Sequence, residues 1–409
     1  ELPSPQGPHD HVRVTRAWWR MDVLGYLDKI AQQLHTVSAK GGKHKALTEP
    51  EGMVTGLHWS PDGSEVGYAT SAGEDQGFIE GAIKAVGKRG TRVLFEGMVQ
   101  DFFWTGDRIG FADGSQMSRH AQLKTVSLKG GRLRSHTKQS DLAVGAFFQV
   151  NSPAARNPSK MIPTSDGKSV YCGIAVGGEA QIHNISIQGR ERNTAVVSGP
   201  RICTLVDAND DALLLTIQDH NNPPELFIHN LASGEERQLT DHNGTWKQRI
   251  RWPDIERITV RSAPGVTIEG WVLKPKHMRA PYKTILYIHG GPHAGFGLSF
   301  QADFQELVGA GYAVVFCNPR GSTGYSSDFA SSILECWGKP ETQDFNAILN
   351  KLVRDGIADK DKLGVTGVSG GGHLSGWLIG HTHRFKAAVP EQGVYNMFSM
   401  WGVSDAGTM

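Results

Sequence analysis

The sequence predicts two architectures in series: an array of short antiparallel strands, and then a parallel sheet with helices on both faces. A loose repeat of strand, glycine turn and strand fills residues 34–240. After about residue 250, buried strands alternate with amphipathic helices. Within this second part, residues 363–379 read as a strand, a sharp glycine-rich turn and a helix.

The repeats in the first part share a strand that ends in a glycine turn. Residues 34–42, LHTVSAKGG, have an echo in residues 123–131, LKTVSLKGG, and more distant echoes lie at 182–189, 226–234 and 83–90. The turn Pro61-Asp62-Gly63 leads into a further strand at 64–69. The spacing centres on about 50 residues, which is the range of β-propeller blades.

Radial packing of blades buries both faces of short sheets and leaves only short edges. We therefore expect residues 1–250 to form a β-propeller, with an ordinary β-sandwich of similar hairpins as the alternative. About five blades are recognisable, and the array opens in mid-pattern. We expect the first blades of this propeller to be missing.

Residues 251–409 are expected to form the second domain. The pattern predicts a hairpin at 258–261 and 268–273, and buried strands at 284–288, 312–317 and 385–389. Helices are expected at 301–310 and 344–353, the latter from an apolar stripe at helical spacing. Such alternation means a parallel sheet that is covered on both faces.

The turn in residues 363–379 carries a candidate nucleophile. Gly367-Val368-Ser369-Gly370-Gly371 fits the G-x-S-x-G nucleophile elbow of the α/β-hydrolases. A strand that turns directly into a helix holds the serine in a strained conformation, and glycines leave room for the close approach. Ser369 would then stand exposed at the helix N-terminus. An ordinary glycine-rich turn between a strand and a helix can match the same G-x-S-x-G pattern, so the assignment needs support from neighbouring motifs.

That support comes from His289-Gly290-Gly291-Pro292, which follows the strand at 284–288. The α/β-hydrolases place an oxyanion N–H in the loop at this point of the chain. We expect the backbone N–H groups of Gly291 and Gly370 to be the two oxyanion donors. A turn with a glycine pair and a fixing proline is the alternative.

Composition excludes several other classes of function. Lys and Arg number 42 against 41 Asp and Glu, so nothing favours nucleic acid or an anionic membrane as a partner. The sequence has no apolar run of about 18 residues, no metal-binding motif and no nucleotide-binding motif, and we expect no metal or cofactor. The four cysteines lie far apart, which indicates reduced buried thiols and a cytoplasmic location.

Several motifs together resemble one family. His289-Gly290-Gly291-Pro292-His293, residues 312–322, residues 363–372 and residues 377–382 resemble the prolyl oligopeptidase family, above all its acylaminoacyl-peptidase branch. Repeats such as residues 59–63 resemble its N-terminal propeller. The resemblance implies a serine peptidase for short peptides, with a propeller that limits access. It implies Ser369 as the nucleophile and the N–H groups of Gly291 and Gly370 as oxyanion donors. Relatives usually have Tyr directly after the nucleophile, where this chain has Gly370.

A serine nucleophile needs a histidine base and a carboxylate that orients it, in the chain order Ser, Asp, His for this fold. After Ser369 the sequence offers His373, His381, His383 and Asp405. We expect the histidines to be structural or surface residues, and Asp405 to lie one strand too early. The acid and base are therefore expected beyond Met409, in a C-terminal part that the hydrolase domain lacks here, and this chain alone should turn over little substrate.

Other polar residues have two interpretations each. Arg320 could hold a substrate carbonyl or carboxylate, although tying down its own loop fits better. Glu179, Asp219, His220 and Glu225 could face a propeller channel, although roles in turns and strand edges fit better. For the whole protein, the alternatives to a peptidase are an esterase on the same elbow and a non-enzymatic propeller scaffold that binds proteins. Assembly into homo-oligomers is left open.

Overall fold

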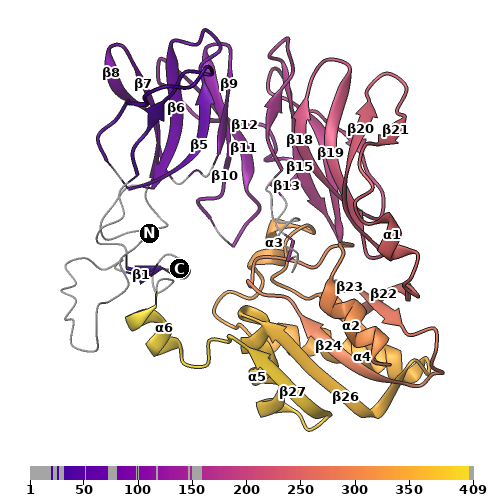
Figure 1. The fold of residues 1–409 in the computed structure, drawn as a ribbon. Coiled ribbons are helices and arrows are strands. Elements are labelled where there is room, and N and C mark those ends of the chain that lie inside the picture. The colour runs from indigo at the N-terminus through magenta and orange to yellow at the C-terminus, as the bar shows by residue number, and fades with distance from the viewer. Residues whose placement is uncertain are drawn as a thin grey trace. The chain divides into compact units, whose positions relative to one another are not determined.

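The computed structural model describes residues 20–21, 25–26, 32–50, 52–71, 81–97, 99, 101–116, 118–145, 148–149 and 159–404 (Figure 1). The chain forms two compact units. One comprises residues 1–102 together with 396–409, and the other comprises residues 103–395. Each unit is described separately below.

The first unit consists of antiparallel strands and one short helix. Its largest sheet is a four-stranded meander in the order β5-β6-β7-β8, and its two smaller sheets are the pairs β1-β2 and β3-β4. The side chains of Leu34, Tyr68 and Val86 form its buried cluster. The elements are β1 (Arg20–Met21), β2 (Gly25–Tyr26), β3 (His35–Thr36), β4 (Lys45–Ala46), β5 (Met53–Trp59), β6 (Glu65–Ser71), β7 (Gly81–Gly87), β8 (Gly90–Glu96) and α6 (Met397–Val403).

The second unit begins with three further four-stranded meanders, β9 to β12, β14 to β17 and β18 to β21. A single parallel bridge, Ala180 to Ile202, joins the last two into one sheet, to which β13 also belongs. The elements are β9 (Phe102–Thr105), β10 (Arg108–Asp113), β11 (Gln122–Ser127), β12 (Arg134–Ser135), β13 (Ala143–Val144), β14 (Ile162–Pro163), β15 (Ser169–Val176), β16 (Glu179–Ser186), β17 (Asn193–Val197), β18 (Ile202–Ala208), β19 (Ala212–Asp219), β20 (Asn222–Asn230), β21 (Glu236–Gln238) and the short helix α1 (Gly244–Lys247).

These meanders follow from local sequence. The turn between β5 and β6 closes through the Gly63 N–H, which donates to the Ser60 carbonyl, and Gly63 adopts a positive φ of 68°. The Asp62 carboxylate accepts from the Ser64 N–H at 3.0 Å, as short polar side chains do in turns. The predicted strand at 64–69 is therefore confirmed as β6, and four-stranded meanders recur as a propeller requires.

The rest of the second unit is a six-stranded sheet in the order β22-β23-β25-β24-β26-β27. The first two strands form the predicted antiparallel hairpin, and β23 is also antiparallel to β25. The remaining pairs, β25 with β24, β24 with β26 and β26 with β27, are parallel. The elements are β22 (Asp254–Ala263), β23 (Val266–Lys274), β24 (Tyr282–Ile288), α2 (Ala302–Gly309), β25 (Ala313–Asn318), α3 (Ser327–Ser331), α4 (Lys339–Arg354), β26 (Ala358–Val368), α5 (Gly370–His381) and β27 (Phe385–Glu391).

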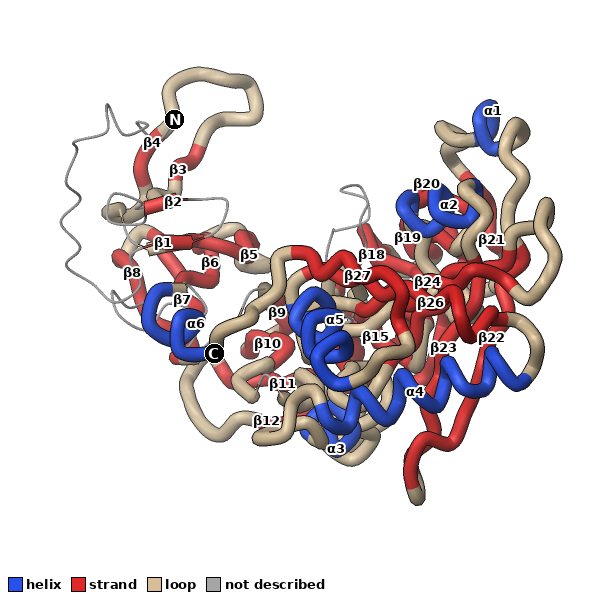
Figure 2. Tube along the Cα trace, turned by 90° about the horizontal axis from the view of Figure 1, so that it is seen from below, coloured by secondary structure: helices blue, strands red, loops and turns tan. Residues whose placement is uncertain are grey.

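Helices cover both faces of this sheet, as predicted. On one face, α4 and α5 pack against strand residues that include Val315 and Val365. On the other face, α2 packs against a cluster that includes Val314 and Phe316. Successive residues of β25 thus alternate between the two cores, which is why the whole strand is apolar and buried. Figure 2 shows α4 running along the strands β22 and β23.

The predicted helices are confirmed, with one difference in length. The helix expected at 301–310 is α2, flanked by Gln301 and Ala310. The helix expected at 344–353 begins five residues earlier, because α4 starts with Pro340 in its first turn and Glu341 closes back on the N–H of Gly338. The predicted boundary at residue 250 falls between β21 and β22, and it stays a prediction because the compact units divide elsewhere.

Candidate active site

The candidate nucleophile lies at the junction of β26 and α5. Ser369 has φ 58° and ψ −119°, a conformation that L-residues rarely adopt, and its side chain is exposed. The Ser369 N–H donates to the Glu391 carbonyl at 2.9 Å, and its carbonyl accepts from the His373 N–H at 2.9 Å. These bonds on either side of the serine hold the strained turn in place.

The glycines of the elbow allow the helix to approach the neighbouring strand. A Cβ atom on Gly367 would lie 2.4 Å from the Ile288 carbonyl oxygen, and one on Gly371 would lie 2.1 Å from the same oxygen. Both distances are far below van der Waals contact. The first and last glycines of the pentapeptide therefore have one common cause, which is the end of β24 beneath the turn.

The two predicted oxyanion residues lie against each other. A Cβ atom on Gly370 would lie 2.5 Å from the Gly291 oxygen and 3.0 Å from its nitrogen. Gly370 is the first residue of α5, where backbone N–H groups lack a partner within the helix. Within the described part of the chain, the N–H groups of Gly291 and Gly370 have no protein acceptor. Their role as oxyanion donors stays a prediction.

The loop that carries Gly291 is held in place by hydrogen bonds through Gln149. Gly291 has a φ of 117°, which favours glycine. The N–H of the preceding Gly290 donates to the side-chain oxygen of Gln149, which lies 141 residues earlier in the chain. Gln301 donates in turn to the Gln149 carbonyl at 2.7 Å. Gln149 belongs to no motif, so sequence reasoning did not identify it.

His289 supports this loop and does not face substrate. The ring is fully buried, and burial lowers the pKa of His289 to about 4. The Nδ1 atom of the ring lies 2.6 Å from the Gly290 carbonyl oxygen, and the Nε2 atom lies 2.9 Å from the Ser322 hydroxyl oxygen. His289 is therefore a positioning residue for the glycine turn.

Of the three histidines after Ser369, His373 and His381 make contacts typical of structural or surface residues, and His383 is exposed. His373 Nδ1 lies 2.6 Å from the Val394 carbonyl, and its ring stacks on Trp337. His381 Nδ1 lies 2.7 Å from the Trp377 carbonyl oxygen, and the His381 ring stacks on the Trp377 ring with 3.9 Å between the centroids. In the described residues, no histidine forms a hydrogen bond with the Ser369 hydroxyl. Asp405 lies outside the described residues.

Arg320 ties down its own loop. It donates to both carboxylate oxygens of Asp344, to the Pro340 carbonyl and to the side chain of Gln343. The Asp344 carboxylate is fully buried, so the pair is shielded from solvent. These bonds occupy the guanidinium fork, which supports the interpretation as a loop anchor.

Three of the four polar residues that we weighed as channel groups accept hydrogen bonds from nearby parts of the chain, and the fourth is His220. Asp219 accepts from the Asn221 N–H at 2.8 Å, and Glu225 accepts from the Asn243 N–H at 3.0 Å. Glu179 accepts from the Gln181 side chain at 2.9 Å. His220 is partly buried, with a pKa lowered mainly by burial.

One more contact joins a blade segment to the hydrolase part, and the sequence did not predict it. Ser327, the first residue of α3, donates its N–H to the Asp141 carboxylate at 2.7 Å and its hydroxyl to the same carboxylate. The His120 N–H donates to the Ser327 hydroxyl at 3.2 Å. Asp141 has a φ of 47°, which Asp tolerates better than most residues.

Comparison with known proteins agrees with this architecture. Acylaminoacyl peptidase of Pyrococcus horikoshii superposes with a TM-score of 0.79 at 22% identity, covering 99% of this chain and 62% of that chain. A puromycin hydrolase gives a TM-score of 0.66 at 17% identity, covering 89% of this chain and 57% of that chain. The predicted fold class, a β-propeller followed by an α/β-hydrolase domain, is confirmed.

Residues 298–408 match the model of the Prolyl oligopeptidase family. The uncharacterized peptidase YuxL of Bacillus subtilis is 32% identical over 283 residues, which cover 68% of this chain and 43% of that protein. Dipeptidyl-peptidase 5 of Porphyromonas gingivalis is 22% identical over 90% of this chain and 54% of that protein. The chain thus spans about half the length of these curated relatives. It belongs to the prolyl oligopeptidase family, as its motifs predicted.

Proposed function

We propose that this protein is a serine peptidase that hydrolyses short peptides through an acyl-enzyme on Ser369. The observation that carries the proposal is the exposed, strained Ser369 followed directly by Gly370, which packs against Gly291. The amides of both glycines lack a protein acceptor among the described residues. Relatives named acylamino-acid-releasing enzyme and dipeptidyl-peptidase 5 support peptides as the substrate class.

In this mechanism the Ser369 hydroxyl attacks the substrate carbonyl, and its proton passes to a histidine base. The carbonyl oxygen becomes an oxyanion and receives hydrogen bonds from Gly291 and Gly370. Each such donor contributes about 3 kcal/mol to transition-state stabilisation. The leaving amine takes the proton, and water then hydrolyses the acyl-enzyme. We propose that the base and its orienting Asp follow residue 409, and that the propeller limits access to short peptides.

Fluorophosphonate labelling tests the nucleophile. The protein in its full length is treated with the probe, and the modified residue is identified by mass spectrometry. We expect one adduct on Ser369 and no adduct in Ser369→Ala. Ser399→Ala is the matched control because Ser399 is exposed on α6 and lies outside the elbow. Absence of an adduct on Ser369 in the unmodified protein would support the scaffold alternative.

Substrate class is tested with paired peptides and esters, each with a free or an acetylated N-terminus. We expect turnover of peptide bonds, and the ratio of kcat/KM between the two forms identifies the terminus that is recognised. Turnover of esters alone would reject the peptidase in favour of the esterase. We also propose a cytoplasmic location, since Cys172, Cys203 and Cys317 are buried free thiols.

A further inference from the structure

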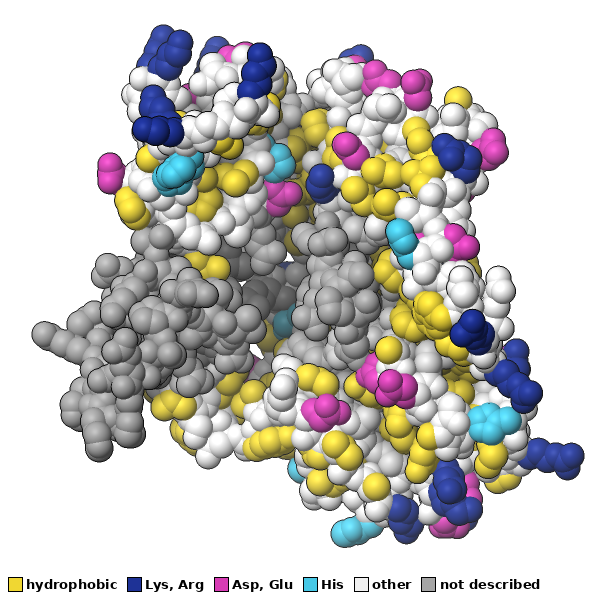
Figure 3. Space-filling model, in the orientation of Figure 1, with side chains coloured by type: hydrophobic (Ala, Val, Ile, Leu, Met, Phe, Trp, Pro, Cys, Tyr) yellow, Lys and Arg dark blue, Asp and Glu magenta, His cyan; other side chains and the backbone are white. Residues whose placement is uncertain are grey.

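A large cleft lies beside the blade formed by β9 to β12. Its volume is about 1720 Å³, and its walls are β10 to β12, the loop that follows β12, and the turn between β16 and β17. Seven Lys or Arg side chains and four Asp or Glu side chains line it. By contrast, the chain as a whole has a net charge of +1, and Figure 3 shows both signs scattered over the face in that view. The positive excess is thus local to this cleft.

All four acidic side chains of the lining are already engaged: Asp141 with Ser327, Asp328 with Arg119 at 3.7 Å, and the other two as follows. Asp113 forms an ion pair with Lys124 on the neighbouring strand. Glu191 accepts hydrogen bonds from the N–H groups of Gln139 at 3.0 Å and Ser140 at 2.8 Å. The two bonds to Glu191 connect the loop after β12 to the turn between β16 and β17. Together these contacts use the carboxylates that could have neutralised nearby cations.

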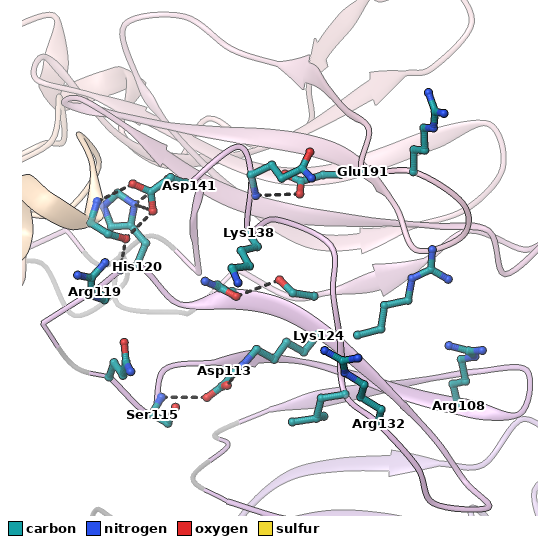
Figure 4. Close-up of a pocket in the computed structure, with 18 of the residues that line it drawn as sticks. Arg108, Asp113, Ser115, Arg119, His120, Lys124, Arg132, Lys138, Asp141 and Glu191 are labelled. Atoms are coloured by element: carbon teal, nitrogen blue, oxygen red, sulfur yellow. Dashed lines mark hydrogen bonds and ion pairs between the residues drawn. The ribbon is translucent and has the colours of Figure 1, made fainter.

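Three of the cations are left without a partner. Within the described residues, the side chains of Arg132, Lys138 and Arg190 form neither an ion pair nor a hydrogen bond, and all three residues are exposed. Figure 4 shows Arg132 and Lys138 inside the cleft. The local field acts on a neighbour as well: burial lowers the pKa of His136 to about 4, and the charges of Arg134 and Arg108 add to the effect.

The lining decides which anion fits. Leu133 is the one large apolar side chain in this lining, which contains no Phe, Tyr or Trp, and the ring of His120 is buried. Neither a lipid nor stacked nucleic-acid bases would therefore find a partner. The volume exceeds that of a typical small-molecule site, which is about 300–1,000 Å³. Guanidinium groups bind carboxylates through two parallel hydrogen bonds. An extended peptide with several carboxylates fits this lining. It needs no apolar partner, it is long enough to use the large volume, and its carboxylates can pair with the guanidinium groups.

We propose that this cleft binds acidic peptides, with Arg132, Lys138 and Arg190 as the groups that pair with their carboxylates. The proposal goes beyond the peptidase function and does not require Ser369 to be a nucleophile. A peptide held here is bound by charge and not by its scissile bond. Binding should therefore depend on the number of Glu or Asp residues and on ionic strength.

The test uses fluorescence anisotropy on the Ser369→Ala protein, which prevents cleavage of the probe. The probes are a fluorescein-labelled decapeptide of alternating Glu and Ser and its counterpart with Gln in place of Glu. The cleft variant combines Arg132→Gln, Lys138→Gln and Arg190→Gln. The control variant combines Arg251→Gln, Arg279→Gln and Lys386→Gln, which removes the same charge from exposed positions outside the cleft.

We expect the Glu peptide to bind at low ionic strength and the Gln peptide to bind at least about tenfold more weakly. The cleft variant should lose at least about tenfold in affinity for the Glu peptide, and the control variant less than about twofold. Equal losses in the two variants would overturn the site, as would equal affinity for the two peptides. Tighter binding of single-stranded DNA than of the Glu peptide would overturn the ligand class. Failure of Ser369 labelling would leave this result unchanged.

Discussion

Glycines serve different purposes in the blade turns and in the elbow. In the turns, a group of glycines has positive φ and open space around the absent Cβ: Gly41, Gly63, Gly90, Gly106, Gly130, Gly189 and Gly234. In the elbow, Gly367, Gly371 and Gly372 are not at positive φ, yet each absent Cβ would lie within 2.4 Å of a backbone carbonyl oxygen. Turn glycines supply a backbone conformation, whereas elbow glycines supply space.

The backbone N–H groups of the two regions also find their hydrogen-bond acceptors in different ways. A blade turn closes on itself, as when the Gly130 N–H donates to the Ser127 carbonyl at 2.9 Å. The Gly290 N–H of the candidate site depends instead on Gln149, far away in sequence. The difference teaches that the blades are specified locally, while the site is specified by packing between distant segments. Four substitutions test this contrast.

The largest effect is expected from Gly371→Ala. The new methyl group would lie 2.1 Å from the Ile288 oxygen, so α5 and β24 have to separate. Overpacking of this kind costs about 3 kcal/mol of unfolding free energy. Urea unfolding measures the loss, and fluorophosphonate labelling of Ser369 should fall with it. A variant with unchanged stability would show that the elbow is not sterically tight.

The next effect is expected from Gln149→Ala, which leaves the Gly290 N–H without its acceptor. An unsatisfied buried donor costs about 2 kcal/mol. Because the adjoining Gly291 then loses its fixed position, the rate of Ser369 labelling should fall more than stability does. Gln149→Glu retains an acceptor and is the matched control. Equal labelling rates in both variants would exclude a positioning role for Gln149.

A smaller effect is expected from Gly63→Ala in the turn between β5 and β6. Its φ of 68° remains, but no atom lies within 4 Å of the new methyl group. The left-handed conformation costs an L-residue about 1–2 kcal/mol. Thermal unfolding gives the value, and labelling of Ser369 should not change. A loss as large as that of Gly371→Ala would remove the distinction between the two kinds of glycine.

The smallest effect, of opposite sign, is expected from Gly380→Ala. This glycine lies in α5 and does not have a positive φ. A Cβ atom added to it would have no other atom within 4 Å. Alanine in a helix is more stable than glycine by about 0.5–1 kcal/mol. A rise in the unfolding midpoint is therefore expected, on the same helix where Gly371→Ala lowers it. Destabilisation by Gly380→Ala would mean that α5 tolerates no side chain at either position.

Local patterns explain how much of this molecule could be predicted from its sequence. The elbow followed from a short motif, and the alternation of buried strands with helices followed from apolar periodicity, because both express short-range sterics. The start of α4 was missed because its first turn is polar and lies outside the apolar stripe. The roles of Gln149 and Asp141 could not be predicted, since each depends on a partner more than a hundred residues away.

The bond between Gln149 and Gly290 has a consequence for the order of folding. The glycine turn cannot reach its final shape until a segment from the preceding sheets has docked beside it. Sheet formation in residues 254–391 can thus be complete while the catalytic geometry is still immature. Fluorophosphonate labelling of Ser369 should therefore return later than secondary structure when the protein refolds, with docking of the Gln149 segment as the final step.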